Sequence, residues 1–130
     1  MTENQGDGVT PSASQHGLME MTHRQLNRVD VFALRGRMMP VEAAALQEQI
    51  EQLIKQGRTS LVLDLAELEY ISSGGIRVLM DARKRAQAAK PRGDLRLANA
   101  GQRIKAVLSL TGLTTYFQSY DDLAEAVGSF

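Results

Sequence analysis

The fold is decided by residues 60–76, which read SLVLDLAELEYISSGGI. The first part, 60–65, is almost continuously apolar, which is typical of a strand buried on both faces of a sheet. We expect a short loop at 66–69. Two serines and two glycines at 72–75 then lead into a helical pattern, so the segment predicts a buried strand, a turn and the start of a helix.

Downstream, apolar residues recur at helical spacing from Ile76. This helix is expected to end near Pro91, because the residue before a proline avoids the α region. Further elements are expected in this order: a strand at 94–98, a helix at 101–110, a short strand at 115–118, and a last helix capped by Asp121.

Upstream, residues 19–34 predict an antiparallel hairpin that turns at Asn27-Arg28. Residues 41–56 carry one apolar stripe at helical spacing and predict a helix. Residues 1–18 are polar and aperiodic, so we expect a disordered leader before one folded domain at 19–130. The predicted order is ββαβαβα(β)α. This is an α/β fold with a mixed sheet of four to five strands and about four helices, because crossover helices imply parallel strands.

Composition excludes several classes of function. The 15 basic and 15 acidic residues cancel, which argues against wholesale binding to nucleic acid or to an anionic membrane. The absence of Cys excludes disulfides, thiol catalysis and Cys-based metal sites. No apolar run is long enough to cross a bilayer, and no secretory signal is visible, so we expect a cytoplasmic protein without direct membrane insertion.

The serines at 72 and 73 are the strongest candidate site. In a parallel sheet, ligands and partners meet the carboxyl ends of the strands, where these serines fall. One serine suffices to cap a helix, yet two are present, and Gly74 and Gly75 would allow close approach of another surface. Two interpretations stay open: an ordinary helix cap with tight packing, or a contact site with a modifiable hydroxyl.

Residues 70–79, with Leu63-Asp64-Leu65 before them, closely resemble the signature of bacterial anti-sigma factor antagonists, which are STAS domains. Residues 108–113 are similar to a second landmark of the family, at the end of its third helix. Gly36-Arg37-Met38 stands where the family has a Gly-x-Leu motif. The resemblance covers about 19–130.

The resemblance implies a non-catalytic switch without a cofactor. Ser72, the first serine of the pair, would be the phosphoacceptor, with Ser73 as second choice. The partner would be an anti-sigma factor serine kinase of histidine-kinase-like ATPase fold, which the unphosphorylated antagonist binds so that a sigma factor is freed. A PP2C-type phosphatase would reset the switch. The expected partner-binding residues are Met38, Met39, Ile71, Ser72, Ser73, Gly74, Gly75 and Arg77.

Two positions depart from the family pattern. Many members have Asp immediately before the serine and Asp after Gly-x-Leu, where this chain has Ile71 and Met39. These departures keep a second function open. In it the chain is an accessory or scaffold subunit of a lipid-transport ABC complex or of a stressosome-like shell, and the serine loop is a static contact.

The other candidate residues do not indicate an enzyme. Ser72 has no His or Lys base nearby in the sequence, and Asp64 lacks a second carboxylate, so a turn or capping role is expected for Asp64. The two histidines, His16 and His23, do not form a metal site. Basic residues also gather on the helix after the serines: Arg77, Arg83, Lys84, Arg85 and Lys90. They are either a basic surface for an acidic partner or a solvated face on which Arg77 pairs with Asp81.

Overall fold

The structure, a computed structural model, describes residues 10–11 and 18–130. Its strands are β1 (Thr10–Pro11), β2 (Met19–Leu26), β3 (Val29–Met38), β4 (Ser60–Ile71), β5 (Asp94–Ala98) and β6 (Ser119–Tyr120). Its helices are α1 (Pro40–Lys55), α2 (Ser73–Ala88), α3 (Gln102–Leu110) and α4 (Leu123–Gly128). Within this part of the chain, no helix is both long and apolar enough to cross a membrane.

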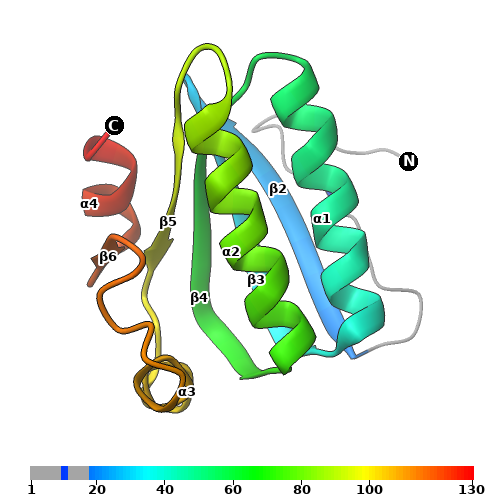
Figure 1. Cartoon of the computed structure of the whole chain (residues 1–130), viewed down its shortest axis with the longest axis vertical. Helices are drawn as coiled ribbons and strands as arrows, with labels where there is room; N and C mark the ends of the chain where they lie inside the picture. The colour runs from blue at the N-terminus through cyan, green and yellow to red at the C-terminus, as the bar shows by residue number, and fades with distance from the viewer. Residues whose placement is uncertain (1–9, 12–17) are drawn as a thin grey trace.

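The six strands lie side by side in sequence order. The pairs β1–β2 and β2–β3 are antiparallel, whereas β3–β4, β4–β5 and β5–β6 are parallel. Each parallel pair requires a crossover, and α1 and α2 supply the first two, side by side over one face of the sheet (Figure 1). The α/β class, the mixed sheet and the opening hairpin predicted from sequence are confirmed.

Apolar side chains form two cores on opposite faces of the sheet. The larger core lies under α1 and α2 and includes Phe32 and Leu63, while the smaller core lies under α4 and includes Val31 and Val62. Successive residues of a strand point to opposite faces, so both cores draw on the same strands. This explains why the sequence at 60–65 is almost continuously apolar.

The loop expected at 66–69 is wrong, because β4 continues through it. Glu67 pairs with Arg35 of β3, and the register shifts twice along this pair of strands. The irregularities break strict alternation, so Leu65, Leu68 and Ile71 are all buried although they lie three residues apart. Without the period of two, this half of the strand does not look like a strand in the sequence.

Smaller corrections concern the two ends of the chain. The last strand is at 119–120 instead of 115–118. Asp122 rather than Asp121 caps α4, because its Oδ1 accepts from the N–H of Glu125 at 2.7 Å. Thr10–Pro11 pairs with β2 although it falls in the expected leader, and the rest of 1–17 lies outside the described residues.

A buried carboxylate anchors the end of the sheet where β3 begins. Asp30 is fully buried; its Oδ1 lies 2.6 Å from Nε2 of His23, and its Oδ2 accepts from Nε of Arg58 at 2.6 Å. His23 also stacks on Phe32. The sequence did not predict this cluster, because its members come from three separate segments.

Candidate functional site

The carboxyl ends of β3 and β4 meet the N-termini of α1 and α2 at one end of the molecule, the lower end in Figure 1. Ser72 lies there, between β4 and α2, with extended backbone angles (φ −75°, ψ 166°). Its Oγ accepts from the N–H of Gly75 at 3.0 Å, and its own N–H donates to the carbonyl of Met38 at 2.9 Å. Ser72 is therefore the N-cap of α2 and is tied to β3 as well.

The two serines differ in exposure. Ser72 is only 7% exposed, whereas Ser73, in the first turn of α2, is exposed. The Ser72 hydroxyl accepts from a backbone N–H, and that donor cannot take up the hydroxyl proton. The site therefore holds one anchored hydroxyl and one free hydroxyl, without an adjacent base at the first.

The two glycines also differ. A Cβ at Gly75 would lie 2.8 Å from Cγ1 of Ile71 and 2.9 Å from Sδ of Met38, whereas a Cβ at Gly74 would meet nothing closer than 3.8 Å. Gly75 thus lets α2 pack closely on the strand ends. A Cβ at Gly74 would make only ordinary van der Waals contacts, with Oγ of Ser72 and Cγ of Pro40.

This difference makes a matched pair of variants. Gly75→Ala should lower the free energy of unfolding by about 1–2 kcal/mol, because overpacking at a buried contact exceeds the gain in helix propensity. Gly74→Ala should raise it by up to about 1 kcal/mol, because it gains propensity without a clash. Urea denaturation measures both, and equal effects of the two variants would contradict the packing role of Gly75.

Two of the expected partner-binding residues need correction. Met38 and Ile71 are buried, because adjacent ends of β3 and β4 turn both side chains into the core beneath Gly75. They pack beneath Gly75 and support the surface from below. Met39 is half-buried, whereas Arg37 is exposed and its guanidinium lies 4.7 Å from the ring centroid of Tyr70.

Exposed apolar side chains occur at the same end of the molecule as the serines. Of the five large apolar residues that are exposed in the described part of the chain, four lie at this end: Leu18, Val41, Tyr70 and Leu110, with Val41 60% and Leu110 87% exposed. They come from four separate segments, so no local sequence pattern announces them. Exposed apolar side chains that gather on one face are typical of protein-binding surfaces.

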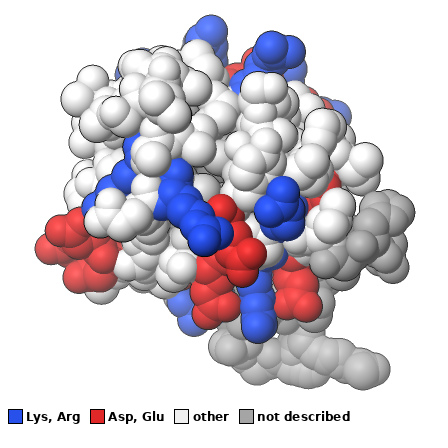
Figure 2. Space-filling view, turned by 90° about the horizontal axis from the view of Figure 1, so that it is seen from below, with Lys and Arg blue, Asp and Glu red and all other residues white. Residues whose placement is uncertain are grey.

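Charge at this end is mixed. Figure 2 views the molecule from here: uncharged residues cover much of the surface, with Lys and Arg close to Asp and Glu around them. The first turn of α2 contains no acidic residue, unlike the first turns of α1 and α4. The positive end of the α2 dipole therefore has no carboxylate in its own first turn.

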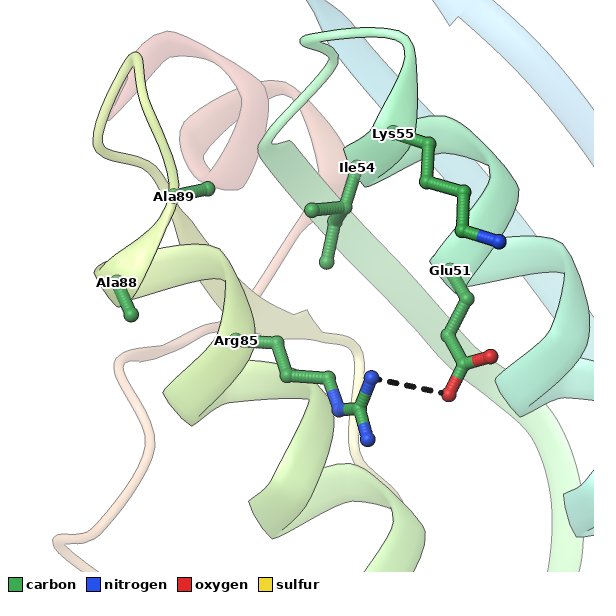
Figure 3. A pocket seen from close by; sticks show the side chains of 6 residues that line it. All are labelled: Glu51, Ile54, Lys55, Arg85, Ala88 and Ala89. Atoms are coloured by element: carbon green, nitrogen blue, oxygen red, sulfur yellow. Dashed lines mark ion pairs between the residues drawn. The ribbon is translucent and has the colours of Figure 1, made fainter.

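The other candidate residues do not join this site. Oδ1 of Asp64 accepts from the N–H of Ala66 and from Nδ2 of Asn99, both at 3.1 Å. The turn or capping role expected for Asp64 is wrong, because the residue lies within β4 and links that strand to the residue after β5. A hollow between the C-terminal ends of α1 and α2, where Glu51 pairs with Arg85 at 3.2 Å, lies at the opposite end of the molecule (Figure 3). No three His, Cys, Asp or Glu side chains of the described residues are grouped to hold a metal ion.

Comparison with known proteins agrees with this picture. The family model of the STAS domain matches residues 20–126. The anti-sigma-F factor antagonist RsfB of Mycobacterium tuberculosis is 26% identical over 122 residues, covering 93% of this chain and 88% of RsfB.

Solved structures share the fold. An anti-sigma factor antagonist from Mycobacterium paratuberculosis superposes with a TM-score of 0.73 and 25% identity, covering 85% of this chain and 92% of that one. The anti-sigma factor antagonist SpoIIAA of Bacillus, at 18% identity and 84% of this chain, superposes with TM-scores of 0.73 unphosphorylated and 0.67 phosphorylated, covering 94% and 97% of SpoIIAA.

Proposed function

Because this chain belongs to the STAS domain family, we propose that it is an anti-sigma factor antagonist that acts by binding another protein at the Ser72 end of the sheet. One observation carries the proposal: most of the large exposed apolar side chains of the described residues belong to segments at the same end of the sheet as the serine turn. The names of the relatives support the same function. Such a regulator works in the cytoplasm and by binding, not by catalysis.

The proposed partner is a kinase-type anti-sigma factor of histidine-kinase-like ATPase fold, and the proposed control is phosphorylation at Ser72. A PP2C-type phosphatase would remove the phosphate. Ser72 lies where the dipole and the N–H groups of α2 favour an anion, and Ser73 remains the second choice because it is exposed. The solved structure of SpoIIAA in a phosphorylated form, which shares this fold, supports the proposal.

The proposed contact surface follows from exposure. Met39, Ser73, Gly74 and Arg77 would touch the partner together with the rim of exposed apolar residues. Ser72 would contribute directly once its side chain turns outward, and Met38, Ile71 and Gly75 would hold the surface in shape.

The burial of Ser72 favours one alternative, in which the serine is a permanent cap and the chain is a scaffold subunit of a transport complex or shell. A binding and phosphorylation assay decides between the two. Each kinase-type anti-sigma factor encoded in the source genome is purified and titrated with the unmodified chain by calorimetry, with ADP and Mg²⁺. The same factors are then incubated with the chain and ATP, and the modified residue is mapped by mass spectrometry.

We expect one factor to bind with a dissociation constant of about 1 µM or tighter and to phosphorylate the wild type but not Ser72→Ala. Modification of Ser73→Ala should persist. If Ser73→Ala abolishes the modification and Ser72→Ala does not, the phosphorylated residue is Ser73. If no factor binds, the antagonist function is wrong and the scaffold function takes its place.

A further inference from the structure

The outer face of α2 carries two basic residues without an acidic partner. The pairing of Arg77 with Asp81 expected from sequence is wrong, because Oδ2 of Asp81 accepts from Nε of Arg85 at 2.8 Å and from Nε2 of Gln47 at 3.4 Å. Arg77 and Lys84 are both exposed, and neither makes an ion pair within the described part of the chain. Their charges are therefore available to another molecule.

These two cations line one hollow between α2 and the segment that follows α3. Ile76, Met80 and Leu113 give the hollow an apolar lining, and Ser73 and Thr111 also line it. Asp81 is a further lining residue, and its carboxylate is paired with Arg85. The neighbouring Leu110, at the C-terminal end of α3, extends apolar surface beyond it. The hollow thus combines apolar side chains with two cations that have no acidic partner in the described part of the chain, and it includes Ser73 of the serine turn.

The spacing of the charges indicates the shape of what fits. Arg77 and Lys84 are seven residues apart, which places them about 10 Å apart along α2. A helix that lies beside α2 can pair with both Arg77 and Lys84 when its own acidic residues are one heptad apart. Apolar residues between those acidic residues would then face the hollow. We infer that this hollow binds an acidic amphipathic helix of the anti-sigma factor. This inference rests on the proposed function.

The inference also gives phosphorylation a second way to weaken binding. Ser73 borders the hollow, and Ser72 precedes it in the chain. A phosphate at either serine adds negative charge beside the place where an acidic helix ends. Repulsion between like charges then weakens binding without any change of fold.

Charge reversal tests the inference. Arg77→Glu combined with Lys84→Glu should weaken binding of the same purified anti-sigma factors by about 10- to 100-fold at low salt, because both attractions become repulsions. Arg77→Lys with Lys84→Arg keeps the charges and should bind within about threefold of the wild type. Arg28→Glu with Arg92→Glu is the matched control, because it reverses two exposed charges at the opposite end of the sheet. All variants should keep the wild-type melting temperature.

Each outcome decides. If the wild type binds a factor and the Arg77/Lys84 reversal changes affinity by less than about threefold, the inference fails and the proposed function stands. If the opposite-end control weakens binding equally, the effect is one of net charge and the inference fails too. If the wild type self-associates and only the Arg77/Lys84 reversal abolishes this, the occupant is a second copy of the chain. If no factor binds any variant, both proposals fall together.

Discussion

Phosphorylation at Ser72 should weaken binding to the anti-sigma factor by about 30- to 1,000-fold, which corresponds to about 2–4 kcal/mol. It should leave the fold intact. The phosphate would lie at the N-terminus of α2, where the helix dipole and unpaired N–H groups stabilise an anion. No carboxylate occupies the first turn of α2, so the dianion meets no acidic residue in that turn.

The cost falls on the complex because of where Ser72 lies. The residue is nearly buried at the bottom of a surface rimmed by exposed Tyr70 and Val41. A phosphate at Ser72 carries a charge of about −1.5 to −2. A partner that covers this rim would remove that phosphate from water without supplying a cation to pair with it, which costs free energy. Desolvation and repulsion therefore act against the bound state only.

Two substitutions separate this effect from a loss of stability. Asp is as good an N-cap as Ser, so Ser72→Asp should keep the wild-type free energy of unfolding while binding is lost. Ser72→Ala removes the bond to the N–H of Gly75 and should cost about 1 kcal/mol, yet it should still bind. The less stable variant is thus the better binder, which no folding defect explains.

The measurements are calorimetric titration and urea denaturation of both variants, with Ser119→Asp on β6 as a matched exposed control. Equal affinities of the Ser72→Asp and Ser72→Ala variants for the anti-sigma factor would contradict control of binding by phosphorylation at Ser72. So would unfolding of the phosphorylated protein, because the modification would then act on the fold and not on the interface.

The fold could be predicted because the apolar patterns between neighbouring residues are strong along this chain. The apolar run at 60–65 and the helical spacing from Ile76 each depend on neighbours in sequence. The serine turn was located in the same way. The second half of β4 was missed because its two register shifts depend on pairing with β3, which the sequence alone does not display.

The surface around the serines depends on contacts that are distant in sequence. Met38 is buried at the end of β3 and packs closely against Gly75, a contact between residues that are distant in sequence. Asp81 has two basic residues at i ± 4, and Gln47 of α1 on one side favours its pairing with Arg85 over Arg77. Such choices between equivalent local partners are made by tertiary structure, so propensity does not reveal them.

Asp30→Ala should lower the free energy of unfolding by about 2–4 kcal/mol, although it lies far from the serines. The carboxylate holds Arg58 and His23 at 2.6 Å each, and Arg58 also donates to the carbonyl of Asn27 at 2.9 Å. Removing it leaves a guanidinium whose side chain is only 26% exposed without its counter-charge. An unpaired, partly buried cation is what makes the loss large.

A surface pair supplies the matched control. Arg35 and Glu67 form an ion pair at 3.3 Å with both side chains about two-thirds exposed, so Glu67→Ala should cost less than about 1 kcal/mol. Urea denaturation of the two variants measures the contrast directly, and similar losses would contradict the role of burial. Because Asp30 lies at the start of β3 and the serines follow the end of β4, folded Asp30→Ala should bind its partner with wild-type affinity. Stability and binding would then reside at opposite ends of one sheet.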